Sequence, residues 1–220
     1  MSAHHSGIGM TSQRTRMRMI ERLREQGIAD EVVLSAMSTI PRHLFVEEAL
    51  ASRAYEDAPL PIHFGQTISS PWIVARMSEL LRANSDLDKI LEIGTGCGYH
   101  TAVLSRLARE VYSLERIGPL LTSTRIRLHG LRINNIHLKH ADGLHGFSEV
   151  ATFDGIIMTA VTAHVPSLLL EQLEVGGRMV FPKGSQKQHL CLIERDSKGF
   201  TETVLEEVNF VPMLSGVVRR

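Results

Sequence analysis

The residues best suited to chemistry lie between Gly94 and Tyr99, where glycine occupies every second position. An apolar run over 89–93 leads directly into this loop, and a helix is predicted to begin near Tyr99. Glycine adopts positive φ angles and lets a ligand approach without meeting a Cβ atom. The free N–H groups and positive dipole end of the helix would face that ligand. This strand–loop–helix pattern predicts a nucleotide or nucleoside site at the carboxyl edge of a parallel sheet.

Three features further along the chain narrow the choice of cofactor. Glu115 follows the second predicted strand, where a carboxylate accepts hydrogen bonds from ribose hydroxyls. Asp142 and Gly143 follow the third strand, where they could meet an adenine, and a buried strand over 153–159 ends at the same edge. Taken alone, Glu115 fits a surface strand end and Asp142-Gly143 a simple turn equally well. The glycine spacing differs from the dinucleotide pattern GxGxxG, and together these features favour S-adenosylmethionine over NAD.

The elements that must position these residues alternate between strand and helix. Strands are predicted over 89–93, 110–114, 136–138, 153–159 and 178–181, the last after a turn at Gly176-Gly177. Helices are predicted over 99–109, over 117–130 and after Pro166. This alternation predicts an α/β fold with a Rossmann-like, doubly wound, mainly parallel sheet over residues 83–220. The last two strands, 189–195 and 201–208, are predicted to form an antiparallel hairpin at the C-terminal edge.

Residues 11–82 are predicted to form an N-terminal helical subdomain that packs on the rest of the chain. Helices are predicted over 12–26, from an Asp30 N-cap to Pro41, over 45–50 and over 72–82, with Ser69 or Ser70 capping the last.

The irregular segment over 55–71 is too apolar for a free linker. Loops of this length within a compact chain are usually functional or disordered. We expect this one to close over the site after cofactor binding.

The amino-acid composition limits the kinds of protein that this chain can be. The chain has 220 residues, 43% of them apolar and 22% charged, which matches a globular protein of one large domain, with or without a subdomain. Lys and Arg together number 24, as do Asp and Glu, so the zero net charge indicates neither nucleic acid nor an anionic membrane as partner. The basic first helix is interpreted as a solvated face, because no aromatic residues interleave its arginines.

Cysteine, histidine and hydropathy patterns exclude further classes. Cys97 and Cys191 lie far apart and the histidines form no HExxH motif, so neither a disulfide nor a metal site is predicted. No stretch is apolar enough to span a membrane. Residues 1–10 lack the apolar core of a signal peptide and are expected to form a disordered leader, with Met10 as an alternative start. We therefore expect a cytoplasmic protein, and expect it to be a monomer.

Several motifs resemble the protein-L-isoaspartate O-methyltransferase family. The most specific is GQTIS-x-P over 65–71, followed by the glycine-loop stretch over 90–99 and the stretch over 111–117. Further similar segments are 170–173, 176–180 and 210–214. The resemblance covers nearly the whole chain from about Ser12. The glycine loop alone would indicate any class I methyltransferase.

The chain departs from the family pattern in three places. His63-Phe64 stands where Gly-His or Gly-Gln is more usual, and Phe64 is expected to narrow the peptide entrance. Cys97 stands where serine is common. Residues 161–164 replace a proline-rich run, which would change side-chain contacts on that rim but neither the fold nor the cofactor.

The resemblance implies methyl transfer from S-adenosylmethionine to the free α-carboxylate of L-isoaspartyl residues in damaged proteins and peptides. Esterification activates this carboxyl, so a succinimide re-forms and part of it opens to normal aspartate, which initiates repair. A main-chain-type carboxyl has a pKa of roughly 3.3–3.7, so it is ionised at neutral pH and needs no general base. Positioning the carboxylate is then the main task. We accordingly interpret as structural the histidines His63, His100, His140, His145 and His164.

By the same resemblance, Ser69 takes the catalytic position and holds the reacting carboxylate, with Thr67 as the second candidate. A helix N-cap is the alternative role for Ser69. Backbone groups of Ile68, Val211 and Pro212 are expected to pair with an extended peptide substrate. Cofactor contacts are assigned to the glycine loop and the strand ends, namely Gly94, Thr95, Gly96, Gly98, Glu115, Asp142 and Gly143.

Three alternatives stay open. Another class I methyltransferase, acting on a small molecule or RNA, would not need the GQTIS loop. An NAD-dependent oxidoreductase would need a GxGxxG register and a catalytic Tyr/Lys or His/Asp set, which the sequence lacks. A non-enzymatic adenosyl-binding module is compatible with the departures at 63–64 and 161–164. A methylation assay that compares isoaspartyl with normal peptides separates all of these.

Overall fold

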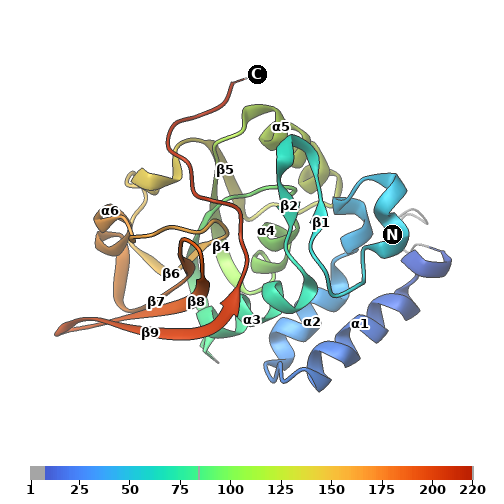
Figure 1. Cartoon of the computed structure of the whole chain (residues 1–220), viewed down its shortest axis with the longest axis horizontal. Coiled ribbons are helices and arrows are strands. Elements are labelled where there is room, and N and C mark those ends of the chain that lie inside the picture. Colours follow the sequence, from blue (N-terminus) through green and yellow to red (C-terminus); the bar gives the residue numbers. More distant parts are fainter. Residues whose placement is uncertain (1–7, 84, 220) are drawn as a thin grey trace.

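A computed structural model describes residues 8–83 and 85–219 (Figure 1). Within them a seven-stranded sheet has the order β5-β4-β3-β6-β7-β8-β9. The bounds of these strands are β3 Leu87–Ile93, β4 Ala108–Glu115, β5 Ile136–His140, β6 Phe153–Met158, β7 Leu173–Gly184, β8 Gln188–Asp196 and β9 Gly199–Val208. The strands from β5 to β7 in this order are parallel, whereas β8 and β9 are antiparallel to their neighbours. The predicted Rossmann-like α/β class with an antiparallel C-terminal edge is confirmed.

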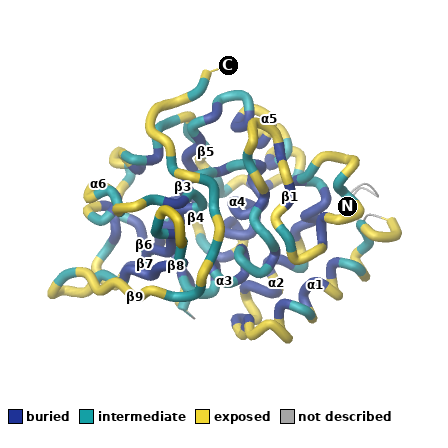
Figure 2. Tube along the Cα trace, viewed as in Figure 1, coloured by how far each residue is buried: buried dark blue, intermediate teal, exposed yellow. Residues whose placement is uncertain are grey.

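Helices cover both faces of this sheet. Their bounds are α1 Gln13–Glu25, α2 Glu31–Thr39, α3 Pro71–Arg82, α4 Tyr99–Leu104, α5 Gly118–Gly130 and α6 Ser167–Glu171. One apolar cluster joins α1 to α5 with sheet residues such as Ile90 and Val111. Their chain neighbours Leu91 and Tyr112 belong to a second cluster, with Leu169 of α6, because successive strand residues face opposite sides. Figure 2 shows the central strands buried and β9 exposed along the edge.

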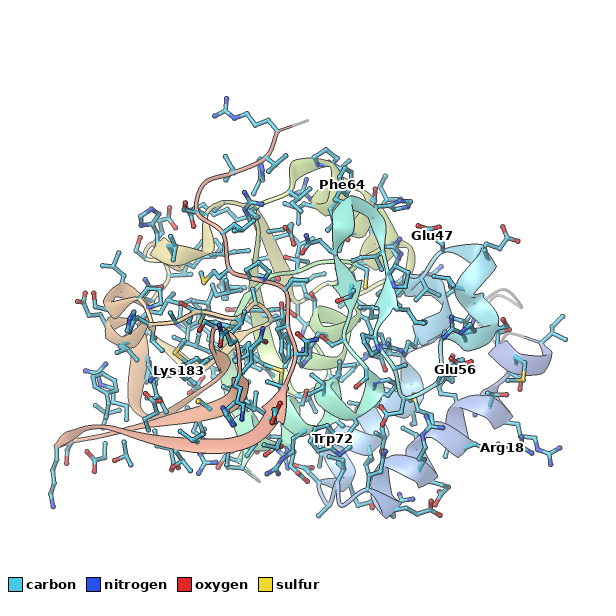
Figure 3. All side chains as sticks on the ribbon, in the orientation of Figure 1. Arg18, Glu47, Glu56, Phe64, Trp72 and Lys183 are labelled. Atoms are coloured by element: carbon cyan, nitrogen blue, oxygen red, sulfur yellow. The ribbon has the colours of Figure 1, made fainter. Side chains whose placement is uncertain are left out.

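The N-terminal helices are joined to the sheet through a buried ion pair. Asp30 caps α2 as predicted, accepting hydrogen bonds from the N–H groups of Val32 and Val33 at 2.9 and 3.2 Å. Its second oxygen accepts from Arg82 Nε at 2.8 Å, at the end of α3. Asp30 and Arg82 are only 5% and 9% exposed, so the contact fixes α2 to the helix that leads into β3. On the outer side, Arg18 of α1 projects into solvent (Figure 3).

The segment over 55–71, expected to be irregular, contains a small hairpin. Strands β1 (Leu60–Pro61) and β2 (Thr67–Ile68) pair antiparallel and form a two-stranded sheet of their own. A 3-10 turn over His63–Gly65 closes the hairpin, and Phe64 lies at its tip, half exposed, with a φ of 62° (Figure 3). The tip contacts the N-terminal region where His63 Nδ1 lies 3.5 Å from a carboxylate oxygen of Glu47.

Three predicted elements differ from the structure. Helix α4 ends at Leu104 rather than 109, because the Ser105 hydroxyl bonds to a carbonyl of the preceding turn and the chain then enters β4. The Gly176-Gly177 turn lies inside β7, where a register irregularity opposite β6 and the positive φ of Gly176 accommodate it. In place of one helix over 45–50 there are two 3-10 helices, Arg42–Phe45 and Glu48–Arg53.

The N-terminal end of the described chain forms a short turn before α1, whereas the C-terminal end forms hydrogen bonds with residues that follow β4. Residues 1–7, most of the expected leader, lie outside the described residues, and the 3-10 turn Gly9–Thr11 precedes α1. At the other end, residues after β9 return across the sheet edge: Val218 forms hydrogen bonds with Arg116 and Gly118. Within the described part of the chain, every helix falls short of the length and apolarity needed to cross a bilayer.

Candidate active site

The site lies where the strand order reverses. From β3 the chain continues to β4 and β5 on one side, and β6 then pairs with the opposite edge of β3. Ligands of open α/β sheets bind at the carboxyl ends of strands at such a reversal. A cavity of about 380 Å³ lies there, a volume within the usual range for small-ligand sites. It is lined by Gly94 after β3, by Glu115 at the end of β4 and by Thr159 after β6.

The glycine loop can form only with glycine at its key positions. Gly94, Gly96 and Gly98 have φ angles of 98°, 54° and 86°, which side chains disfavour. A Cβ atom on Gly94 would also lie 2.3 Å from Thr159 Oγ1. The N–H groups of Gly94 and Thr95 both donate to the Leu114 carbonyl, which fixes the loop against β4.

Gly98 lies behind this loop rather than on the cavity. It is the N-cap of α4 and does not line the cavity, whereas Gly94, Thr95 and Gly96 do. A Cβ atom on Gly98 would lie 2.6 Å from Thr124 Cγ2 of α5. Its absent side chain therefore allows α5 to pack closely, which shapes the loop from behind.

Glu115 is held in place by the loop it faces. The side chain is 5% exposed and lines the cavity. Its oxygens accept hydrogen bonds from the backbone N–H groups of Gly96 and Ile117, at 2.8 and 2.9 Å. Each carboxylate oxygen has a second lone pair, so Glu115 can also accept from hydroxyl groups of a ligand.

Of the pair after β5, only Gly143 reaches the cavity. Asp142 does not line it, and both of its oxygens accept backbone N–H groups, from Leu144 at 2.9 Å and from Gly216. A Cβ atom on Gly143 would lie 2.4 Å from Ile93 Cγ2. Asp142 therefore shapes the turn at Gly143 and ties the C-terminal segment to it.

The GQTIS loop forms a second wall of the same cavity. Thr67, Ile68 and Ser69 line it, as does the glycine loop. The N-cap of α3 is Ser70, whose hydroxyl accepts from the Ile73 N–H at 3.4 Å. Within residues 8–83 and 85–219, the Ser69 hydroxyl has no hydrogen-bond partner, so the alternative capping role falls to its neighbour.

The C-terminal segment forms the third wall. Val211 and Pro212 line the cavity. The Val161 N–H donates to the Val211 carbonyl at 2.9 Å, and the Val161 carbonyl accepts from Met213 N–H at 2.8 Å. Because the carbonyls of an extended strand alternate in direction, the Pro212 carbonyl points away from Val161. Phe64, expected to narrow the entrance, is not among the residues that line the cavity.

A buried polar network beneath the glycine loop was not identified from the sequence. Glu92 is fully buried, and one oxygen accepts from the hydroxyls of Thr101 and Ser113, both at 2.5 Å. The other oxygen has no partner among the described residues. Burial raises the pKa of Glu92 to about 7, the two hydroxyls oppose the shift, and nearby Glu115 adds to it. The available signal was a carboxylate within an apolar strand, directly before the glycines.

Two further residues line the wall: His100, interpreted from the sequence as structural, and Thr159, which the sequence analysis did not single out. His100 lines the cavity, and burial lowers its pKa to about 3, so it is neutral; its Nε2 lies 3.1 Å from the Ser78 hydroxyl. Thr159 donates through its hydroxyl to the Gly94 carbonyl at 2.9 Å. Its position at the end of a predicted buried strand was the only sequence signal. No cluster of His, Cys, Asp or Glu able to hold a metal ion occurs in the described part of the chain.

Comparison with known proteins decides among the class I methyltransferases. The family model for protein-L-isoaspartate(D-aspartate) O-methyltransferase (PCMT) matches residues 14–218. The chain belongs to the PCMT family. A PCMT-family relative from Nitrosomonas eutropha, named protein-L-isoaspartate O-methyltransferase, is 69% identical over 100% of both chains. Another of that name, from Methylobacillus flagellatus, is 61% identical over 98% of each.

One solved structure agrees with the PCMT assignment, and a second has the same fold. A protein-L-isoaspartate O-methyltransferase structure matches with a TM-score of 0.83 and 26% identity, covering 92% of this chain and 67% of its own. A PCMT structure from Plasmodium falciparum, in complex with S-adenosyl-L-homocysteine, matches with a TM-score of 0.77 and 24% identity, covering 90% and 98%. The second likeness concerns the fold alone.

Proposed function

We propose that this PCMT-family chain is a protein-L-isoaspartate O-methyltransferase. In this role it uses S-adenosylmethionine to esterify the free α-carboxyl of L-isoaspartyl residues in damaged proteins and peptides. The observation that carries the proposal is that the glycine loop and the GQTIS loop line the same cavity. A methyl donor and a carboxylate acceptor can therefore meet in one site.

The cofactor side of the cavity fits S-adenosylmethionine. Gly94 and Gly96 leave a cradle that a Cβ atom would strain or fill. Glu115 has lone pairs for ribose hydroxyls, and Gly143 offers a surface without a side chain for the adenine. The positive charges of the cofactor suit a site that is lined by a buried acidic residue, Glu115. When bound, the cofactor supplies an electrophilic methyl group on a positively charged sulfur.

The task of the acceptor side is to hold an anion, since no proton has to be removed from it. Ser69 donates its hydroxyl proton in a hydrogen bond to one carboxylate oxygen and leaves the other directed at the methyl group. Thr67 is the second candidate for this role. The Pro212 carbonyl accepts a backbone N–H of the extended peptide, beside Ile68 and Val211. Such backbone recognition would tolerate many flanking sequences.

The roles of two assigned residues are narrower than the sequence suggested. Asp142 does not line the cavity, whereas Gly143 does, so under this proposal Asp142 acts by positioning Gly143. Gly98 supports the loop through its packing against α5. Both remain necessary for the cofactor side under this proposal.

The first test compares labelled methyl transfer to a synthetic L-isoaspartyl peptide and to its normal aspartyl twin. We expect base-labile label on the isoaspartyl peptide alone. Ser69→Ala should lower kcat about 100-fold, the usual effect of removing one aligned donor, with unchanged affinity for S-adenosylhomocysteine. Ser123→Ala, an exposed serine of α5, is the control and should keep full activity. Label on neither peptide, with the cofactor bound, would reject the proposed acceptor.

We also propose that the protein acts as a monomer in the cytoplasm, without nucleic acid or membrane partners. Both Cys97 and Cys191 are free thiols, in keeping with a reducing compartment.

A further inference from the structure

Arg42 is a fully buried arginine that connects two backbone segments beside the acceptor wall. It lies in the 3-10 helix Arg42–Phe45 and is 0% exposed. Its Nε donates to the Ala54 carbonyl and its Nη2 to the Ser69 carbonyl, both at 2.7 Å. Its guanidinium carbon lies 4.6 Å from the centre of the Tyr99 ring. Arg42 thus holds the residue proposed to bind the reacting carboxylate.

The charge of Arg42 is not balanced by an ion pair. In the described part of the chain no carboxylate forms one with it, and Nη1 is buried without a partner. Asp57 contributes a weaker attraction, but its oxygens accept from the Trp72 N–H and the Gln26 amide. Burial lowers the pKa of Arg42, but a guanidinium stays charged at neutral pH. A buried charge without a counter-ion is expensive and calls for a function.

A negatively charged group that balances Arg42 can bind in the cavity. Ser69, Cys97 and Tyr99, which surround the guanidinium, all line the cavity, whereas Arg42 does not. An anionic acceptor held at Ser69 would feel this charge through a region of low dielectric, where charge interactions are strong. Because Arg42 stays behind the wall, it attracts the carboxylate without binding the oxygen that must act as nucleophile.

We propose that Arg42 is a positioning residue for the acceptor: it fixes Ser69 through the backbone carbonyl, and its charge makes the site prefer an anionic carboxylate over a neutral group. This inference rests on the proposed function, because it takes the isoaspartyl carboxylate as the acceptor. A purely structural role would require only the two hydrogen bonds. A requirement for the positive charge of Arg42 therefore distinguishes the positioning role from a purely structural role.

The experiment measures peptide binding with S-adenosylhomocysteine in place of the methyl donor, so that no turnover occurs. Two peptides are compared: one with L-isoaspartate and one in which its α-carboxyl is a neutral carboxamide. The variants are Arg42→Met, Arg42→Gln, which keeps hydrogen-bond donors without charge, and Arg42→Lys, which keeps the charge. Arg16→Met is the matched control, because Arg16 is also buried and bonded to a backbone carbonyl, that of Ser38 at 3.1 Å, but lies outside the cavity wall.

We expect the Met and Gln variants of Arg42 to lower the carboxylate-over-carboxamide affinity ratio about tenfold or more, the scale of a lost buried charge interaction. Arg42→Lys should keep the ratio while lowering kcat, because one ammonium cannot hold both carbonyls in the same geometry. Arg16→Met should leave the ratio unchanged. If Arg42→Met fails to bind S-adenosylhomocysteine, the Gln and Lys variants alone decide.

The proposal would be overturned by an unchanged carboxylate-over-carboxamide affinity ratio in Arg42→Gln, or by an equal decrease of this ratio in Arg42→Gln and Arg42→Lys. Arg42 would then only cross-link two backbone segments. An equal change in Arg16→Met would also overturn the proposal. Failure of the proposed function looks different, because the wild-type protein itself would then not methylate the isoaspartyl peptide.

Discussion

Replacing Glu92 with glutamine tests whether the carboxyl buried beneath the glycine loop makes stability depend on pH. In the folded protein, burial raises the pKa of Glu92 to about 7, from an ordinary value of 4.5. Between these two values the folded state keeps a proton that the unfolded state has released. Stability therefore falls as pH rises through this window, because the unfolded state gains from ionisation in water, whereas ionisation in the folded state would leave a buried charge. Below pH 4.5 the group is protonated in both states and this cost is absent.

The size of the effect follows from linkage. With these two pKa values, the wild-type protein should lose roughly 2–3 kcal/mol of unfolding free energy between pH 5 and pH 8.5 through this group alone. The Glu92→Gln variant has no titrating group there and should not show this loss. Its amide NH₂ replaces the oxygen that lacks a partner, which costs a roughly constant 1–3 kcal/mol at every pH.

The assay is urea unfolding of both proteins across this pH range, without cofactor, with the difference in unfolding free energy plotted against pH. Subtraction removes the contributions of all other titrating groups. We expect the unfolding free energy of the Glu92→Gln variant to increase steadily relative to that of the wild type as pH rises. A difference that stays flat from pH 5 to pH 8.5 would refute the reasoning, because Glu92 would then have the same pKa in both states.

Two further changes test other contacts. Asp30→Ala removes both the α2 cap and the partner of the buried Arg82, so we expect a loss of about 3–5 kcal/mol in thermal or urea unfolding, and a loss under 1 kcal/mol would contradict it. Gly98→Ala places a methyl group 2.6 Å from Thr124 at a φ of 86°, so calorimetry should show weakened S-adenosylhomocysteine binding together with a lower Tm, and unchanged binding would contradict the packing role.

The sequence was most informative where local chemistry determines structure. The glycine loop, the Asp30 cap and the alternation of strands and helices follow from residue-level preferences, and the structure has them as predicted. The short hairpin over 60–68 was missed because each strand has only two residues, too few for a periodic pattern. The Gly176-Gly177 pair was interpreted as a turn, although a bulge in β7 uses the same backbone freedom.

The site was predicted in part for a related reason. Residues on the loops were found because their types are unusual, and most of them line the cavity. Asp142 does not line the cavity, and its contact with Gly216, a residue distant in sequence, could not be predicted from the local pattern. Glu92 and Arg42 were overlooked because a charged residue in an apolar stretch looks like an exposed position until tertiary packing buries it.

The acceptor side of the cavity is built from two segments far apart in the sequence, the GQTIS loop and the segment over 210–214, whereas the cofactor side comes from residues between them. During translation these parts appear in a fixed order. Ser69 is synthesised first. Roughly 145 further residues must then be added before the segment over 210–214 is complete, which takes on the order of 10–30 s at usual elongation rates. The late segment also supports the cofactor side, because the Gly216 N–H donates to Asp142, which shapes the turn at Gly143. A nascent chain therefore completes neither side of the cavity until residues 210–216 have been synthesised.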